Sequence, residues 1–191
     1  MPPARTVAAV VLAAGGGRRY GMPKALVEYE GSLLVERAVG TATAVCDPVL
    51  VVLGARAVDV WRAARLDDAL VLANRDWETG MASSLRTGLD GLRGLPVPVD
   101  AALVLLVDMP GVTPAALRRM AEHAAPDALA VATYDGVRGH PVLLGREHWA
   151  GVAETATGDE GARRYLAAHD VTEVDCTGLA DPTDLDVPPA P

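Results

Sequence analysis

The chain has 191 residues, of which 50% are hydrophobic, and its 17 basic and 25 acidic residues give a formal net charge of −8. This length fits one domain over 1–191, with enough apolar side chains for a substantial core. The acidic balance argues against non-specific nucleic-acid binding, and no apolar run approaches the ~20 residues that a membrane span needs.

The first predicted element is a short apolar run over 7–14, whose β-branched valines indicate a strand buried on both faces. Three glycines follow it, Gly15, Gly16 and Gly17, and then come Arg18 and Lys24. The backbone N–H groups of such a loop form a concavity for anions, and arginine and lysine supply full positive charges. This stretch therefore predicts a phosphate-binding loop.

Neither common glycine motif fits this loop. A P-loop would need lysine where Met22 stands and serine or threonine where Pro23 stands, and the dinucleotide fingerprint would need a small residue at Tyr20. The remaining pattern, L-A-A-G-x-G-x-R-x-G-x-P-K, runs from Leu12 to Lys24. It resembles the signature loop of the GT-A type nucleotidyltransferases built on a Rossmann-like sheet, and most closely that of the molybdenum cofactor cytidylyltransferases.

Helices and strands alternate along the rest of the chain. Ser32 is placed to cap the first helix, and Thr113 with Pro114 opens a later one. Apolar runs predict further strands at 49–53, 70–73, 101–107, 129–134, 137–144 and 171–176. Helical spacing and punctuating residues predict helices at 32–45, 56–65, 83–92, after Thr113, at 145–153 and at 160–169.

This alternation predicts an α/β fold with three Rossmann-like layers: a mostly parallel, twisted sheet, helices on both faces, and a small hairpin formed by 129–134 and 137–144. Ligands of such sheets bind outside the carboxyl ends of the strands. The glycine loop, 74–84 and 108–110 each follow a predicted strand, so we expect them to meet at one edge. The proline-rich tail from about 186 is expected to be loose.

Asp108 directly follows the most apolar predicted strand. Mg²⁺ prefers oxygen ligands and usually takes one or two carboxylates together with substrate phosphates, so we predict that Asp108 holds Mg²⁺. The alternative is an ordinary turn aspartate. The resemblance implies the same metal role, because V-D-M-P matches the metal-binding strand end of the family. It also implies Asp181 as a second metal ligand, although the family's D-T-P-E-D-L motif is altered here to D-P-T-D-L.

Two further segments carry the resemblance. Asn74 to Leu85 matches N-x-x-W-x-x-G-M-x-S-S-L, which in the family lies against the base and ribose; the serines at a helix start are either anion ligands or ordinary caps. The resemblance implies nucleotide contacts by Leu12, Ala13, Ala14, Gly15, Gly16, Gly17, Lys24, Asn74, Gly80, Met81, Ser83 and Ser84. Similarly, G-H-P-V and G-D-E-G-A-R imply acceptor contacts by Gly139, His140, Pro141, Asp159 and Arg163, with a purely structural His140 as the alternative.

The resemblance implies Mg²⁺-dependent transfer of a nucleotide monophosphate from an NTP to a phosphorylated acceptor, with release of pyrophosphate. Such a reaction rests on positioning and charge neutralisation, so Arg18, Lys24 and Asp108 are the expected catalytic residues. Within this resemblance, L-A-A-G together with V-D-M-P favours CTP, which implies molybdopterin as the acceptor.

Two alternatives remain open. One is a related transferase that uses GTP or another NTP with a sugar phosphate or other phosphorylated acceptor. The other is a nucleotide or cofactor carrier for a molybdoenzyme partner. For each of these we expect a cytoplasmic protein that binds neither nucleic acid nor membranes.

Overall fold

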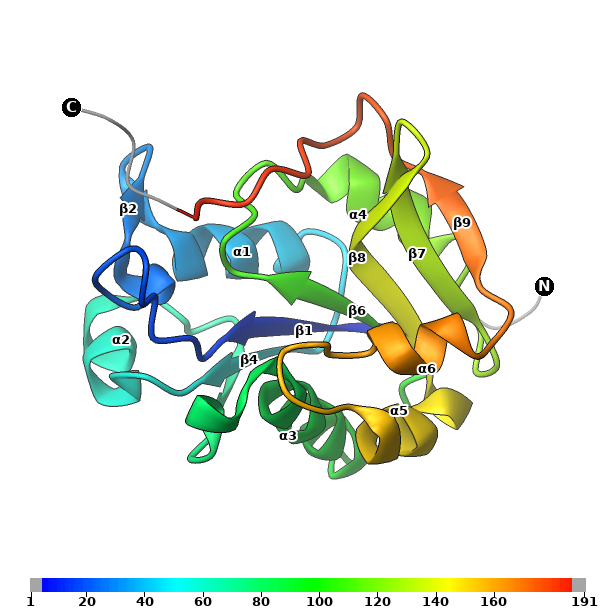
Figure 1. Ribbon diagram of the computed structural model, residues 1–191, viewed down its shortest axis with the longest axis horizontal. Helices are drawn as coiled ribbons and strands as arrows, with labels where there is room; N and C mark the ends of the chain where they lie inside the picture. The colour runs from blue at the N-terminus through cyan, green and yellow to red at the C-terminus, as the bar shows by residue number, and fades with distance from the viewer. Residues whose placement is uncertain (1–4, 187–191) are drawn as a thin grey trace.

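The computed structural model describes residues 5–186 and is built on a seven-stranded sheet in the order β5-β4-β1-β6-β8-β7-β9 (Figure 1). All neighbouring strands run parallel except those on either side of β8, which is antiparallel to β6 and β7. The sheet strands are β1 Val7–Ala13, β4 Val49–Leu53, β5 Leu70–Ala73, β6 Ala101–Leu106, β7 Leu129–Tyr134, β8 Val137–Gly145 and β9 Thr172–Asp175. The predicted hairpin is therefore β7 and β8.

Helices cover both faces of this sheet, as predicted (Figure 1). The helices are α1 Leu34–Thr43, α2 Ala57–Ala63, α3 Met81–Arg93, α4 Pro114–Ala121, α5 Trp149–Thr155 and α6 Arg163–Ala167. Strand β1 shows why there are two cores: Val11 and its odd-numbered neighbours pack with α1, α2 and α4, whereas Val10 and its even-numbered neighbours pack with α3, α5 and α6. Successive side chains of a strand point to opposite faces, so a fully apolar strand serves both cores.

The start of α1 differs from the prediction. Ser32 does not cap the helix but pairs with Tyr29, in a small hairpin of β2 Glu28–Tyr29 and β3 Ser32–Leu33 that follows a 3₁₀ turn, η1 Lys24–Leu26. Leu33 is the residue before the helix, and its backbone N–H donates to Glu36 Oε2 in the first turn at 3.0 Å. The cap at Thr113 is confirmed, because its Oγ1 accepts from the N–H of Ala116.

The later helices are shorter than the periodicity suggests. The segment 145–153 forms a 3₁₀ turn, η3 Arg146–His148, before α5, and α6 begins only at Arg163. Among residues 5–186, no helix is both long and apolar enough to cross a membrane. The expected loose tail falls outside the described residues except for Asp186.

Adjacent strands place the main loops side by side. Leu12 of β1 is paired with Leu106 of β6, so the glycine loop after β1 and the turn at Asp108 leave the sheet at the same edge. A third segment reaches that edge through a 3₁₀ turn, η2 Trp77–Thr79, which leads into α3. The predicted convergence of the three loops is therefore present.

Candidate functional site

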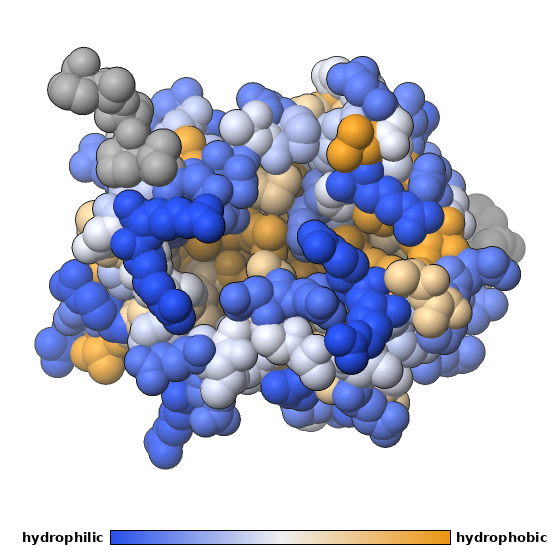
Figure 2. Space-filling model, viewed as in Figure 1, coloured by the Kyte–Doolittle hydropathy of each residue, from blue (hydrophilic) through white to orange (hydrophobic). Residues whose placement is uncertain are grey.

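A cavity of about 530 Å³ lies at the carboxyl ends of β1 and β6. Figure 2 shows a hollow on this face with an apolar floor and hydrophilic side chains along its rim. Its lining combines the glycine loop, the end of β6, the start of α3 and two residues from later segments. It consists of Leu12, Ala14, Gly15, Gly16, Gly17, Arg18, Arg19, Lys24, Trp77, Glu78, Thr79, Gly80, Met81, Ser84, Leu106, Val107, Asp108, Asp159 and Asp186.

The glycine loop is a tight turn that needs a glycine at its centre. Gly17 has a φ of +61°, and a Cβ there would collide with the carbonyl oxygen of Met22. The N–H of Gly21 donates to the carbonyl of Gly17 at 2.8 Å and closes the turn. Of the predicted loop residues, Ala13 does not line the cavity, because its side chain points into the core shared with α1.

Lys24 is the only lysine in the sequence, and it lies among acidic groups. Its Nζ is 2.8 Å from Asp108 Oδ2 and 3.1 Å from Asp186 Oδ1. Burial by itself lowers the pKa of Lys24, but hydrogen bonds and attraction from the two carboxylates outweigh burial and leave the pKa raised. The ammonium group is therefore held charged beside Asp108.

Two arginines extend this positive charge along the loop. Arg18 and Arg19 both line the cavity, and Arg19 Nη1 also lies 3.4 Å from Asp186 Oδ2. The sequence-based prediction selected Arg18, but the fixed arginine of the loop pattern falls on Arg19. Counting the pattern from Leu12 would have identified Arg19 as well.

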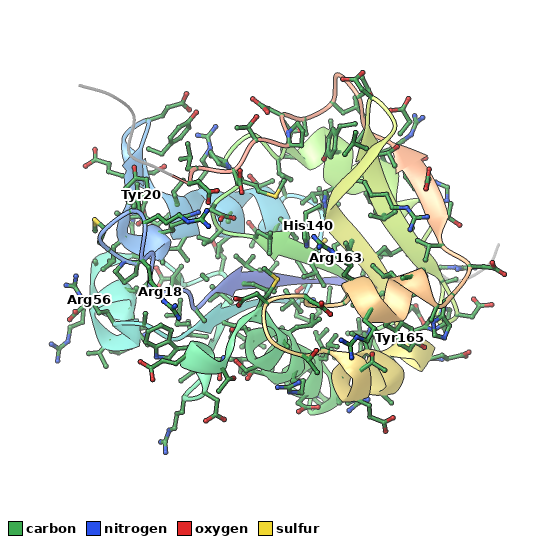
Figure 3. All side chains as sticks on the ribbon, in the orientation of Figure 1. Arg18, Tyr20, Arg56, His140, Arg163 and Tyr165 are labelled. Carbon is green, nitrogen blue, oxygen red and sulfur yellow. The ribbon has the colours of Figure 1, made fainter. Side chains whose placement is uncertain are left out.

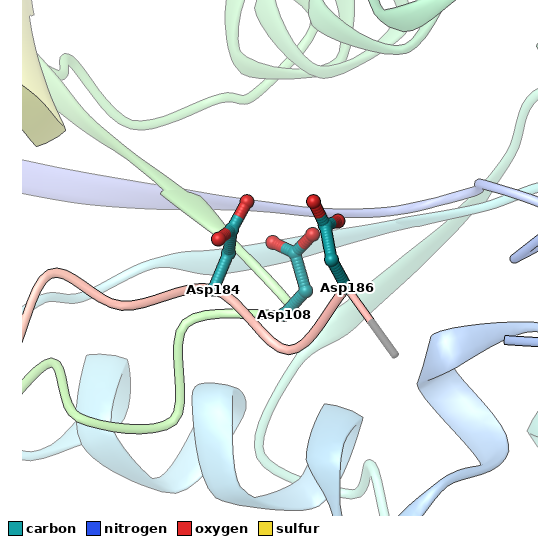
Figure 4. A group of neighbouring side chains, drawn as sticks. All are labelled: Asp108, Asp184 and Asp186. Atoms are coloured by element: carbon teal, nitrogen blue, oxygen red, sulfur yellow. The ribbon is translucent and has the colours of Figure 1, made fainter. Parts of the chain in front are cut away.

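The acidic residues around Asp108 differ from those predicted. Asp108, Asp184 and Asp186 each offer a carboxylate oxygen within 4.8 Å of the others, and Figure 4 shows the three groups side by side. Asp181 is not brought into this cluster. Its Oδ1 accepts from the N–H of Thr183, and its own N–H donates to the carbonyl of Gly111, so it holds a turn before the cluster.

A second difference concerns the segment that was expected to face the base. Asn74, Ser83 and Ser84 are all buried, and Asn74 Nδ2 donates to both serine hydroxyls. Only Ser84 of these three lines the cavity, together with Gly80 and Met81. Asn74 and Ser83 therefore support the cavity wall from behind instead of facing the cavity.

The sequence left two alternatives for the start of α3, anion binding and capping by the serines, and the structure shows other partners for its N–H groups. The N–H of Met81 donates to Asp159 Oδ1 at 3.2 Å, and the N–H of Ala82 donates to the carbonyl of Gly158 at 2.9 Å. Gly80 has a φ of +110°, and a Cβ there would lie 2.5 Å from Gly158. Asp159 thus caps the helix, which satisfies N–H groups that a phosphate would otherwise use.

The remaining predicted acceptor residues lie beside the main cavity. His140 lines a small adjoining pocket that shares Leu12 and Met81 with it, whereas Gly139, Pro141 and Arg163 line neither. Figure 3 shows His140 next to Arg163 and well away from Arg18. Burial lowers the pKa of His140 to about 4, an effect that Asp108 opposes and Arg163 reinforces. His140 is therefore neutral at neutral pH.

Trp77 is the main cavity residue that the predicted site omitted. A Cβ on Gly16 would lie 3.0 Å from Trp77 Cζ3, and one on Gly54 would lie 2.5 Å from Trp77 Cβ. The indole therefore packs against two glycines and supports the glycine loop. Its place in the N-x-x-W pattern was the available signal.

Two relatives illustrate the range of names in this group of proteins. Nicotine blue oxidoreductase of Paenarthrobacter nicotinovorans is 35% identical over 94% of this chain and 92% of its own length. A protein of Geobacillus sp. (strain WCH70) named probable molybdenum cofactor guanylyltransferase is 28% identical over 62% of this chain and 58% of its own.

Solved structures agree with the fold. Rv0371c of Mycobacterium tuberculosis H37Rv is 32% identical and superposes with a TM-score of 0.84, covering 96% of this chain and 94% of that one. A structure of Rv0371c in complex with manganese gives a TM-score of 0.76 at 29% identity, covering 91% and 89%. The sequence model of the MobA-like NTP transferase domain matches residues 9–174. The chain therefore belongs to the MobA-like NTP transferase family, and its fold matches that of the nucleotidyltransferase structures.

Proposed function

We propose that this nucleotidyltransferase moves a nucleotide monophosphate, most favourably CMP from CTP, onto the phosphate of molybdopterin and releases pyrophosphate. The observation that carries the proposal is the meeting, in one cavity, of the glycine loop, the Lys24 ammonium and the Asp108 carboxylate. An NTP presents a polyanion and a planar base. The cavity offers cations at one loop and uncharged side chains such as Leu12 and Met81 elsewhere, which matches both parts.

The donor set around Asp108 fits a hard divalent cation. Three carboxylates supply oxygen ligands only, the chemistry that Mg²⁺ and Mn²⁺ prefer, and no cysteine or histidine belongs to this cluster. We assign Asp108, Asp184 and Asp186 as the residues that would hold Mg²⁺, in place of Asp181. When bound, the ion would supply charge neutralisation for substrate phosphates. A manganese complex of the neighbour Rv0371c is consistent with this assignment.

The side chains of this chain have simple tasks in that reaction. An acceptor phosphate is already anionic at neutral pH, so no general base is required. Lys24 and Arg18 would bind the β- and γ-phosphates and stabilise the departing pyrophosphate. To do so, Lys24 must exchange its contact with Asp186 for one with phosphate. The reaction then depends on holding two anions in line, and positioning of this kind lowers barriers substantially.

The most specific parts of the proposal are the nucleobase of the NTP and the identity of the acceptor. The L-A-A-G and V-D-M-P motifs support CTP, whereas the name of the Geobacillus relative supports GTP. Of the acceptor-side residues, Asp159 lines the cavity and His140 lines the adjoining pocket, so these two would contact molybdopterin. Transfer of the product to a molybdoenzyme partner belongs to the same proposal.

The test measures pyrophosphate release from each of CTP, GTP, ATP and UTP with Mg²⁺, with molybdopterin and with sugar phosphates as acceptors. We expect release with CTP and molybdopterin, and a loss of at least a hundredfold in Asp108→Asn. Asp170→Asn is the matched control, because Asp170 is exposed and lies outside the cavity lining. Absence of release with every pair would refute the proposal. Loss in Asp181→Asn combined with full activity in Asp186→Asn would restore the sequence-based metal ligand.

A second function is favoured by one specific observation, the 35% identity to nicotine blue oxidoreductase over nearly the whole chain. By analogy with that name, the same cavity would bind nicotine blue and carry out its oxidation or reduction. Incubation of the protein with nicotine blue and a panel of reductants, followed by the absorbance of the dye, tests it directly. Turnover there without pyrophosphate release from any NTP would replace the transferase proposal.

A further inference from the structure

The two edges of the seven-stranded sheet, β5 and β9, carry different side chains. β9 contains Glu173 and Asp175, and Glu173 pairs with Arg138; charged residues of this kind hinder the pairing of an edge with another strand. β5 has the sequence LVLA and carries no charge. Its Leu70 and Val71 are 48% and 37% exposed, although these residue types are among those most often buried. β5 therefore lacks the protection that β9 has.

The backbone of β5 also has hydrogen-bonding groups that point away from the sheet. The N–H of Asn74, directly after β5, donates to the carbonyl of Leu53 in β4. Alternate residues of a strand direct their backbone groups to opposite sides, so Val71 and Ala73 direct theirs outward. Outside the strand ladder, no backbone hydrogen bond among residues 5–186 involves either of these two. The outer side of β5 can therefore pair with a further strand.

We propose that β5 pairs with β5 of a second copy of this chain, antiparallel and about a twofold axis, so that the two sheets join into one. An interface with twofold symmetry uses the same surface on both copies, and it must therefore be complementary to itself. The proposal is independent of the proposed function, because it concerns an edge of the sheet and not the cavity.

Symmetry and charge limit how the two strands can be aligned. A twofold axis perpendicular to the sheet leaves each side chain on its own face, so it passes through a residue near the middle of the strand, either Val71 or Leu72. With the axis at Leu72, Asp68 of one copy would lie opposite Asp76 of the other. Like charges directly opposite each other are destabilising, which argues against this alignment.

The alignment centred on Val71 brings complementary groups together. Val71 of each copy would exchange both backbone hydrogen bonds with its counterpart, and Leu70 would lie opposite Leu72. Asp67 of each copy would lie opposite Arg75 of the other. Both residues are exposed, and no ion pair among residues 5–186 involves either one. A second copy thus supplies the opposite charge at both ends of the strand.

The first test measures the dissociation constant of the dimer by sedimentation equilibrium of the full chain. Arg75→Asp places acidic groups opposite each other at both ends of the strand, so the Kd should rise about five- to a hundredfold, and by less in high salt. Exchanging the two charges, in Asp67→Arg with Arg75→Asp, should return the Kd to within about threefold of wild type.

Arg118→Asp is the matched control for these charge changes. It alters the net charge by the same amount as Arg75→Asp, at an exposed position of α4, a helix that packs against β6, β7 and β8. Its Kd should stay within about twofold of wild type, because charges far from an interface contribute little.

The second test concerns the backbone. Val71→Pro removes an N–H that points outward, so the ladder between β5 and β4 is kept and the circular dichroism spectrum should not change. The dimer should dissociate at least about tenfold more readily, because the hydrogen bonds at its axis are lost. If this variant does not fold, Arg75→Asp and the exchanged pair decide.

Three results would overturn the proposal. One is a wild-type chain that stays monomeric up to about 1 mM. Another is a dimer with the same Kd in Arg75→Asp and Arg118→Asp, because the copies would then meet at a different surface. The third is a double variant that dimerises more weakly than Arg75→Asp, since the two changes would then add as unrelated losses. Pyrophosphate release tests the proposed function separately from all three.

Discussion

Gly80→Ala provides a sharp test of how the cavity is assembled. Gly80 joins η2 to α3, with φ +110° and ψ 176°, a region of backbone space that is open to glycine and almost closed to other residues. An added Cβ would lie 2.5 Å from the carbonyl carbon and oxygen of Gly158 and 2.8 Å from Asp159 Oδ1. Both the conformation and the contact therefore oppose alanine.

The expected cost has two parts. A residue forced into such a φ/ψ region costs about 1–3 kcal/mol. Inserting a methyl group into a well-packed contact adds about 1–3 kcal/mol, because the neighbour here is backbone and cannot rotate away. Together they predict that the free energy of unfolding falls by about 2–6 kcal/mol, a large share of the 5–15 kcal/mol that is typical of a folded protein.

Urea denaturation measures this change, and Gly40→Ala is its control. Gly40 lies inside α1, and an added Cβ there would meet no atom within 4 Å. The same substitution should therefore stabilise the chain by about 0.5–1 kcal/mol, because alanine is the better helix former. Opposite signs for the two variants are expected. Equal stability of Gly80→Ala and wild type would show that the loop around Gly158 does not pack on α3 as described.

Two further predictions concern charge and protonation. Lys24→Met should raise the KM for the NTP by about ten- to a hundredfold through loss of a charged hydrogen bond, and a KM within twofold of wild type would remove Lys24 from the phosphate site. Since burial lowers the pKa of His140 to about 4, the unfolded chain binds more protons between about pH 6.5 and 4, and acidification through this window destabilises the fold. Between pH 7 and pH 5, His140 should lower the free energy of unfolding of the wild type by about 2 kcal/mol. Denaturation of His140→Gln at both pH values should show a smaller decrease in this free energy. An equal decrease in the two proteins would contradict the low pKa of His140.

Much of the fold follows from local patterns. The run of apolar residues in β1 must be buried on both faces, and this alone requires helices on both sides of the sheet. The glycine loop and Asp108 were placed together because β1 and β6 are parallel, so their carboxyl ends share an edge. Thr113 was found because a cap depends only on residues three positions away.

Other site assignments depended on contacts between distant segments, which no local pattern contains. Ser32 does not cap α1, and the side chain at this helix start that accepts hydrogen bonds is Glu36. Its carboxylate accepts from the N–H of Leu33 and from the N–H of Arg65, 29 residues away. For the start of α3 the sequence left two alternatives, anion binding and capping by its serines, but Asp159 caps it from 78 residues further along the chain. The motif also does not predict which way each side chain points. Asn74 and Ser84 belong to the same motif, yet only Ser84 faces the cavity.

The sequence by itself therefore determined where the candidate site lies: apolar strands end in a cationic glycine loop and an aspartate, and parallel strands bring these ends together. Only the tertiary structure decided which side chains take part. Asp186 accepts a hydrogen bond from Lys24, 162 residues earlier in the chain, whereas Asp181 accepts one from the N–H of Thr183. These partners differ because the path of the final segment is set by its packing against the rest of the fold. A motif fixes residue types and spacing, whereas the meeting of two carboxylates depends on where each backbone runs and which way each side chain points.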